Sequence, residues 1–188
     1  PDGSPQMIRL PWPYYPFLSA HSNNPISKNL DRVLPIFPSS IDTVSAPGIR
    51  KTVLLASDTN SRTISSPAMV SLNATALTDD DFRTFNKSYV PVAVLLEGQF
   101  KSLFANRLTP QIQDSVAKAL GLPFAASSAT EGKQIVVSDG DIFTNAVTNT
   151  SGPLPMGMIP FENYRFANRE FFQNSIDYLV NASNIFVA

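Results

Sequence analysis

The sequence predicts an α/β domain in which helices flank a mixed sheet and a Pro-rich, extended part precedes it. Two short apolar runs at residues 90–96 and 134–138 are typical of strands buried on both faces. Helical signals follow each run, at residues 109–121 and 168–180. This order favours a right-handed parallel unit in the second half of the chain, whereas the first half favours antiparallel pairing.

Prolines dominate the N-terminal part. The chain has 16 prolines, and they are dense over residues 1–47 and again over 153–160. Because proline lacks a backbone N–H and restricts the residue before it, helix is disfavoured in the first fifty residues. We expect extended segments at 7–10 and 40–44 there. Two β-rich runs at 52–57 and 68–72 can pair as a long hairpin.

The helix expected over residues 110–120 has the clearest boundaries. Thr109 can cap its first turn, Pro110 fits the first helical position, and Gly121 ends it. Its apolar positions repeat every four residues, at Ile112, Val116 and Leu120.

The last helix is expected to begin after Asn168 and to pack on the sheet. Four apolar residues at helical spacing predict the packed stripe. They are Phe172, Ile176, Leu179 and Val180.

Length and composition limit the classes of protein to which the chain can belong. Its 188 residues suit a single domain spanning 1–188. Fourteen basic and 15 acidic side chains give a net charge of −1 without basic clusters, which argues against nucleic acid as a partner. The absence of cysteine excludes disulfides, cysteine nucleophiles and cysteine-bound metals. No apolar stretch in the sequence is long enough to span a bilayer.

The segment 135–141 is the strongest local candidate for a binding site. Asp139, Gly140 and Asp141 follow a predicted strand directly, and Asn145 lies on the turn behind them. Ligands of open α/β sheets bind beyond the carboxyl ends of the strands, and two carboxylates there can hold Mg²⁺ or Ca²⁺. In the structural alternative, Asp139 caps the next turn and Gly140 provides its tight geometry. A metal-dependent phosphohydrolase would need a later acidic pair, which the sequence lacks.

An aromatic run near the N-terminus is the second candidate. Trp12, Tyr14 and Tyr15 could stack against a sugar or peptide, pack into the core, or form a protein interface. His21 is the only histidine and lies in a polar loop, so a Ser/His/Asp triad is disfavoured.

Six segments, in order, resemble the gliding-motility-associated auxiliary proteins of ABC transporters in Bacteroidetes, the GldG family. No single segment is diagnostic, and the resemblance rests on their order along nearly the whole chain. The segments are residues 10–16, 24–30, 95–98, 103–107, 136–141 and 171–179.

The resemblance implies a membrane-anchored protein whose extracytoplasmic part accompanies a permease and an ATPase, as a substrate-binding component. It implies a fold related to flavodoxin-like and glutaminase-like domains. Proteins of this family carry an upstream half with membrane helices, so this chain, which begins at Pro1, is expected to start inside the extracytoplasmic part. No catalytic residues carry over, and the glutaminase nucleophile is missing because the chain has no cysteine.

We therefore predict a non-enzymatic, extracytoplasmic (periplasmic) accessory domain of an ABC-type transport system, with no cofactor and with permease and ATPase subunits as partners. Its predicted functional edge comprises Asp139, Gly140, Asp141 and Asn145. The sequence leaves two alternative functions open. A carbohydrate- or peptide-binding module would use Trp12, Tyr14 and Tyr15, and a metal-dependent phosphohydrolase would use Asp139 and Asp141.

Overall fold

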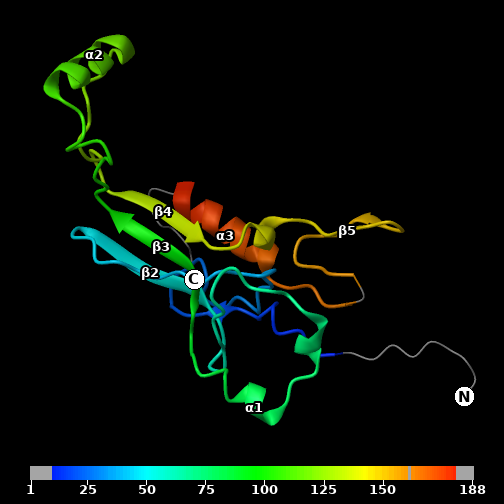
Figure 1. Cartoon of the computed structure of the whole chain (residues 1–188). Helices are drawn as coiled ribbons and strands as arrows, with labels where there is room; N and C mark the ends of the chain where they lie inside the picture. Colours follow the sequence, from blue (N-terminus) through cyan, green and yellow to red (C-terminus); the bar gives the residue numbers. More distant parts are fainter. Residues whose placement is uncertain (1–9, 161, 181–188) are drawn as a thin grey trace, which may run out of the picture.

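A four-stranded antiparallel sheet lies at the centre of the molecule, in the order β1-β2-β3-β4 (Figure 1). The structure is a computed structural model and describes residues 10–160 and 162–180. The strands of this sheet are β1 (Ser19–Ala20), β2 (Ile49–Ala56), β3 (Pro91–Gly98) and β4 (Gly132–Val137).

The other elements are helices, 3-10 turns and a second, smaller sheet. The helices are α1 (Asp79–Phe82), α2 (Pro110–Leu120) and α3 (Asn168–Val180), with 3-10 turns η1 (Leu72–Thr75) and η2 (Gly140–Phe143). A second, two-stranded sheet pairs β5 (Val147–Thr148) with β6 (Gly152–Pro153). Within residues 10–160 and 162–180, no helix has the length and apolar character needed to cross a membrane.

The predicted α/β class is confirmed, but the predicted parallel unit is wrong. β3 and β4 occupy the two predicted apolar runs, and Pro91 stands at the first position of its strand, where a missing N–H is tolerated. These strands pair antiparallel, with Ala93 opposite Val137 and Gly98 opposite Gly132. A parallel crossover requires the connecting helix to pack back on the sheet, and α2 leads away from it instead (Figure 1). The sheet therefore also differs from the parallel sheets of flavodoxin-like domains.

The predicted N-terminal strands are only partly present. β2 covers residues 52–56 of the expected run at 52–57, but its partners are β1 and β3, and residues 68–71 are not in a strand. Residues 40–44 also lack strand structure, although the Ile41 amide donates to the Pro91 carbonyl at 2.8 Å. The expected segment at 7–10 lies outside the described residues except for Leu10.

The core lies between the sheet, α3 and the Pro-rich segment that precedes β2. Leu18, Ile26 and Val33 from that segment share one buried cluster with Leu95 of β3 and Phe171 of α3. The Pro-rich part of the chain is therefore not a detached tail over these residues. It supplies apolar side chains that cover parts of the sheet and helix.

Helix α3 is present as predicted, but the prediction of which of its residues pack inward is wrong. Its buried residues are Asn168, Phe171, Ser175 and Tyr178. The predicted stripe is 37–73% exposed at Phe172, Ile176, Leu179 and Val180. One position along a helix is a rotation of about 100°, so a second stripe, which holds Phe171 and Tyr178 beside two polar residues, lies next to the predicted one. Hydrogen-bond partners on other segments determine which of the two stripes is buried.

Asn168 is the polar residue that fixes one end of α3. Its side chain accepts the Leu34 amide at 2.9 Å and donates to the carbonyls of Leu34 at 2.8 Å and Ile142 at 3.0 Å. A buried amide without partners is costly, so these bonds favour the rotation that turns Asn168 inward.

Candidate functional site

Residues 99–131 form an arm that connects β3 to β4 and projects from the sheet (Figure 1). Its two legs run antiparallel at the base. The Ser128 amide donates to the Phe100 carbonyl at 2.8 Å, and the Ser102 amide donates to the Ala126 carbonyl at 2.9 Å. Helix α2 lies at the far end, away from the body of the domain (Figure 1). Its predicted boundaries are confirmed: Thr109 is the N-cap and Gly121 ends the helix in a left-handed conformation at φ 68°.

The apolar stripe of α2 is open to solvent. Ile112, Val116 and Leu120 are 47%, 37% and 70% exposed, and no residue of α2 is buried within the described part of the chain. Leu103, Phe104 and Leu122, from the segments flanking α2, are also exposed. We call these six side chains the tip surface. Large exposed apolar surfaces are typical of protein or membrane contacts.

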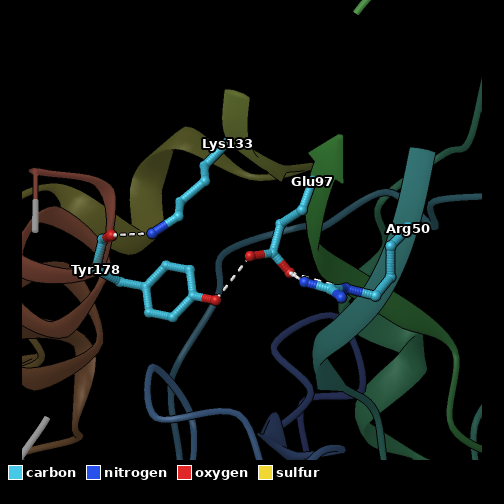
Figure 2. Close-up of polar contacts among 4 residues, drawn as sticks. All are labelled: Arg50, Glu97, Lys133 and Tyr178. Atoms are coloured by element: carbon cyan, nitrogen blue, oxygen red, sulfur yellow. Dashed lines mark hydrogen bonds and ion pairs between the residues drawn. The ribbon is translucent and has the colours of Figure 1, made fainter. Parts of the chain in front are cut away.

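A partly buried polar network lies at the base of the arm. Figure 2 shows Glu97, the penultimate residue of β3, between Arg50 of β2 and Tyr178 of α3. Its carboxylate accepts two bonds from Arg50, at 2.8 and 3.2 Å, and one from the Tyr178 hydroxyl at 2.8 Å. Lys133, opposite Glu97 in the sheet, donates to the Tyr178 carbonyl at 3.3 Å. Both strands from which the arm leaves are thereby tied to α3.

The environment of this network changes the acidity of its members. Burial acts most strongly on Glu97 and would raise its pKa, but the hydrogen bonds from Arg50 and Tyr178, with the charges of Arg50 and Lys133, together lower that pKa below its ordinary value. Burial, followed by the bond to Glu97, raises the pKa of Tyr178. Glu97 is therefore a carboxylate and Tyr178 a neutral donor at neutral pH.

Gly98, at the end of β3, allows two backbone segments to pack closely at the base of the arm. Its φ is +143°, and a Cβ there would collide with the carbonyl of Gly48. Glycine alone permits this close approach of the turn before β2 to the end of β3. The arm therefore begins at a position fixed by backbone packing as well as by the Glu97 network.

The structure does not gather the predicted edge residues around a common site. Asp139 is buried, and its carboxylate accepts the amides of Asp141 at 2.9 Å and Ile36 at 2.6 Å. It therefore caps η2, as the structural alternative supposed, and also fastens the Pro-rich segment. Asp141 is exposed, and Asn145 donates to the Leu154 carbonyl at 2.7 Å.

Gly140 is exposed at the start of η2. Among the described residues, no group of three or more His, Asp or Glu side chains is placed to hold a metal ion. The binding role of Asp139, Gly140, Asp141 and Asn145 stays a prediction.

The predicted aromatic residues do come together. The Trp12 ring centroid lies 4.9 Å from that of Tyr14 and 6.2 Å from that of Tyr15, and Tyr15 meets Phe37 edge to face at 5.1 Å. The three predicted residues are half-buried. Phe37 was not predicted as a member, because it is far from the others in sequence. Binding of carbohydrate or peptide by Trp12, Tyr14 and Tyr15 stays a prediction.

Tyr14 also lines a cavity of about 510 Å³. Its lining comes from Pro13, Tyr14, Pro16 and residues 37–40 of the N-terminal part, and from the loop after β2, Phe85 and the start of β3. Arg62 is the charged side chain in its lining. The sequence marked Tyr14 but not Arg62 or Phe85, because the lining residues come from segments that are far apart in the chain.

The architecture defines an α/β domain with an antiparallel sheet at its centre and an apolar surface on a projecting arm. Residues 1–175 match the family model ABC_transp_aux, described as an ABC-type uncharacterized transport system. The chain belongs to this family, which supports an accessory role in an ABC-type transport system. The resemblance to ABC-transporter auxiliary proteins is thus confirmed, and the narrower assignment to the GldG family stays a prediction. Comparison with curated proteins and with solved structures returned no match.

Proposed function

We propose that the chain is a non-enzymatic, extracytoplasmic accessory domain that docks on the permease of an ABC transport system, in a complex that includes the ATPase. In the full-length protein, segments outside this chain anchor it to the membrane, and the system serves gliding motility. The observation that carries the proposal is α2, an amphipathic helix held away from the body with its apolar stripe uncovered.

The expected partner surface is an apolar groove. Anchors at positions i, i+4 and i+8 on one helix face are typical of helix-in-groove recognition. Burying a large aliphatic side chain contributes about 1.5–3 kcal/mol, so Ile112, Val116 and Leu120 can together support a stable contact after the cost of ordering. Family membership supports a permease as the owner of the groove.

Substitutions on the two faces of α2 test the proposal. Asp114 and Lys118 lie on the side of the helix opposite Val116, because each residue advances the helix by about 100°. The double variant Ile112→Gln/Leu120→Gln removes apolar anchors, whereas Asp114→Gln/Lys118→Gln changes the polar face with the same new side chain.

The full-length tagged protein is purified from native membranes in mild detergent, and permease and ATPase are quantified by mass spectrometry. We expect the apolar-face variant to lose at least about tenfold in recovered permease, as the loss of about 1.4 kcal/mol or more predicts. The polar-face variant should retain wild-type recovery. Equal recovery of the permease by wild type and both variants would refute docking through α2.

A further inference from the structure

We propose that the cavity beside Tyr14 binds a small organic anion, with a carboxylate at Arg62 and an apolar body between Tyr14 and Phe85. This inference goes beyond the proposed docking function and does not depend on it. The cavity lies on the loops after β2 and before β3, whereas docking uses the arm.

The size and lining of the cavity suit a small molecule. Its volume of about 510 Å³ falls within the range of about 300–1,000 Å³ that is typical of ligand sites. Aromatic rings of Tyr14 and Phe85 and aliphatic side chains of Ile64, Val70 and Val92 form its apolar lining. An apolar body of one aromatic ring or a short chain would be covered by these groups.

The contacts of Arg62 orient its guanidinium group for binding an anion. Its guanidinium carbon lies 4.8 Å from the centre of the Phe85 ring, and one terminal nitrogen donates to the Thr84 hydroxyl at 3.0 Å. These contacts fix the plane of the group and leave most of its five donors unused. Among the described residues, no acidic side chain forms a direct ion pair with Arg62.

The surroundings of Arg62 favour a negative ligand. None of the described residues that line the cavity is acidic, and Lys87 donates to the lining residue Thr63 at 2.6 Å, which adds a second positive charge nearby. Asp81 is close enough to sense the charge of Arg62, but its carboxylate is bonded to the amide and hydroxyl of Thr78, at 2.8 and 2.6 Å. A fixed arginine without a direct ion-pair partner can bind a carboxylate in a bidentate manner.

Polar side chains can bind further groups of the ligand. Within the described part of the chain, the side chains of Ser40, Asn60 and Ser66 form no hydrogen bond although they line the cavity. The Ser57 hydroxyl differs, because it accepts the Val90 amide at 3.0 Å and so has a structural role. The site thus combines one anion-binding group, an apolar lining and a few uncommitted polar groups.

A matched pair of ligands tests the charge requirement on the 188-residue chain. 3-Phenylpropionate and its neutral amide share the same apolar body, and benzoate and 4-phenylbutyrate with their amides vary its length. Trp12 is the only tryptophan, and its ring lies 4.9 Å from that of Tyr14, so its fluorescence reports on the cavity. We expect saturable binding of at least one acid, at least about tenfold tighter than its amide.

Arginine variants assign that preference to one residue. Arg62→Gln should abolish the preference for the acid, and Arg62→Lys should weaken it by keeping charge without the planar fork. Arg83→Gln removes an arginine whose side chain is 82% exposed and should change nothing. Thermal unfolding confirms that each variant is folded.

The proposal is overturned if no acid of the series binds saturably, if acid and amide bind equally, or if a folded Arg62→Gln variant retains the preference. No permease is present in this experiment, so its outcome is separate from that of the docking test.

Discussion

At the scale of single residues, three buried polar side chains determine how the elements of this domain meet. Glu97 joins β3 to β2 and α3, Asn168 joins α3 to the Pro-rich segment and η2, and Asp139 joins η2 to the same segment. Each of these side chains forms hydrogen bonds with groups that are distant in sequence. Removing one member of such a group leaves buried polar atoms unpaired, which costs more than the net value of the bond.

Glu97→Gln tests the charged network at the base of the arm. The amide can still accept from Tyr178, but it loses the charge-assisted bonds from Arg50. We expect a loss of about 1–3 kcal/mol in the free energy of unfolding at pH 7, measured by urea denaturation. The control is Asp114→Asn, which neutralises an exposed carboxylate on α2 of the arm and should leave the stability nearly unchanged.

The same variant has a defined dependence on pH. The folded pKa of Glu97 lies below its unfolded value, which is near 4.5. The carboxylate therefore stabilises the fold above pH 4.5, and this contribution is lost as the pH falls through the lower, folded pKa. Wild type and Glu97→Gln should converge in stability below pH 4.5. A constant difference between them across that range would contradict the assignment.

At the scale of elements, the sequence predicted what depends on local signals. Thr109, Pro110 and Gly121 mark the ends of α2 through backbone geometry that neighbouring residues determine, and the structure has the helix between them. The apolar runs of β3 and β4 were located for the same reason. Their antiparallel pairing was not predicted. A helix between two strands normally implies a parallel crossover, but α2 does not return to the sheet.

The rotation of α3 was mispredicted for a different physical reason. Hydrophobic spacing favours the stripe with more apolar residues, and that stripe is the exposed one. The buried stripe is selected by Asn168 and Tyr178, whose partners lie on distant segments. Such partners are not visible in the sequence of the helix.

Truncations on the two stripes of α3 test this rotation. Phe171→Ala removes a fully buried ring and should lower the free energy of unfolding by about 3–5 kcal/mol. Ile176 lies on the exposed stripe and is itself 43% exposed, so Ile176→Ala should lower the free energy of unfolding by under about 1 kcal/mol. Thermal or urea unfolding of both variants provides the comparison. Equal losses, or a larger loss at Ile176, would mean that α3 packs through the other stripe.

At the scale of the whole molecule, the two candidate sites lie on different parts of the fold. The arm, whose strands are fixed by the Glu97 network, carries α2 at its far end (Figure 1). The cavity with Arg62 lies among the loops between β2 and β3 and the N-terminal aromatic residues. Sequence reasoning found Tyr14 but missed Arg62 and Phe85, because loops far apart in the chain form the cavity. Contact with a partner and binding of a ligand can therefore be separated by mutation.

Site-specific photo-crosslinking in native membranes tests whether α2 docks on the permease. A photoreactive phenylalanine analogue replaces Val116 on the apolar stripe of α2 or, as the control, Asp114 on the opposite face. Crosslinked products are then identified by mass spectrometry. We expect a crosslink to the permease from position 116 and a much weaker one from position 114. A folded protein that gives no permease crosslink from position 116, or equal crosslinks from both positions, would contradict docking through the arm.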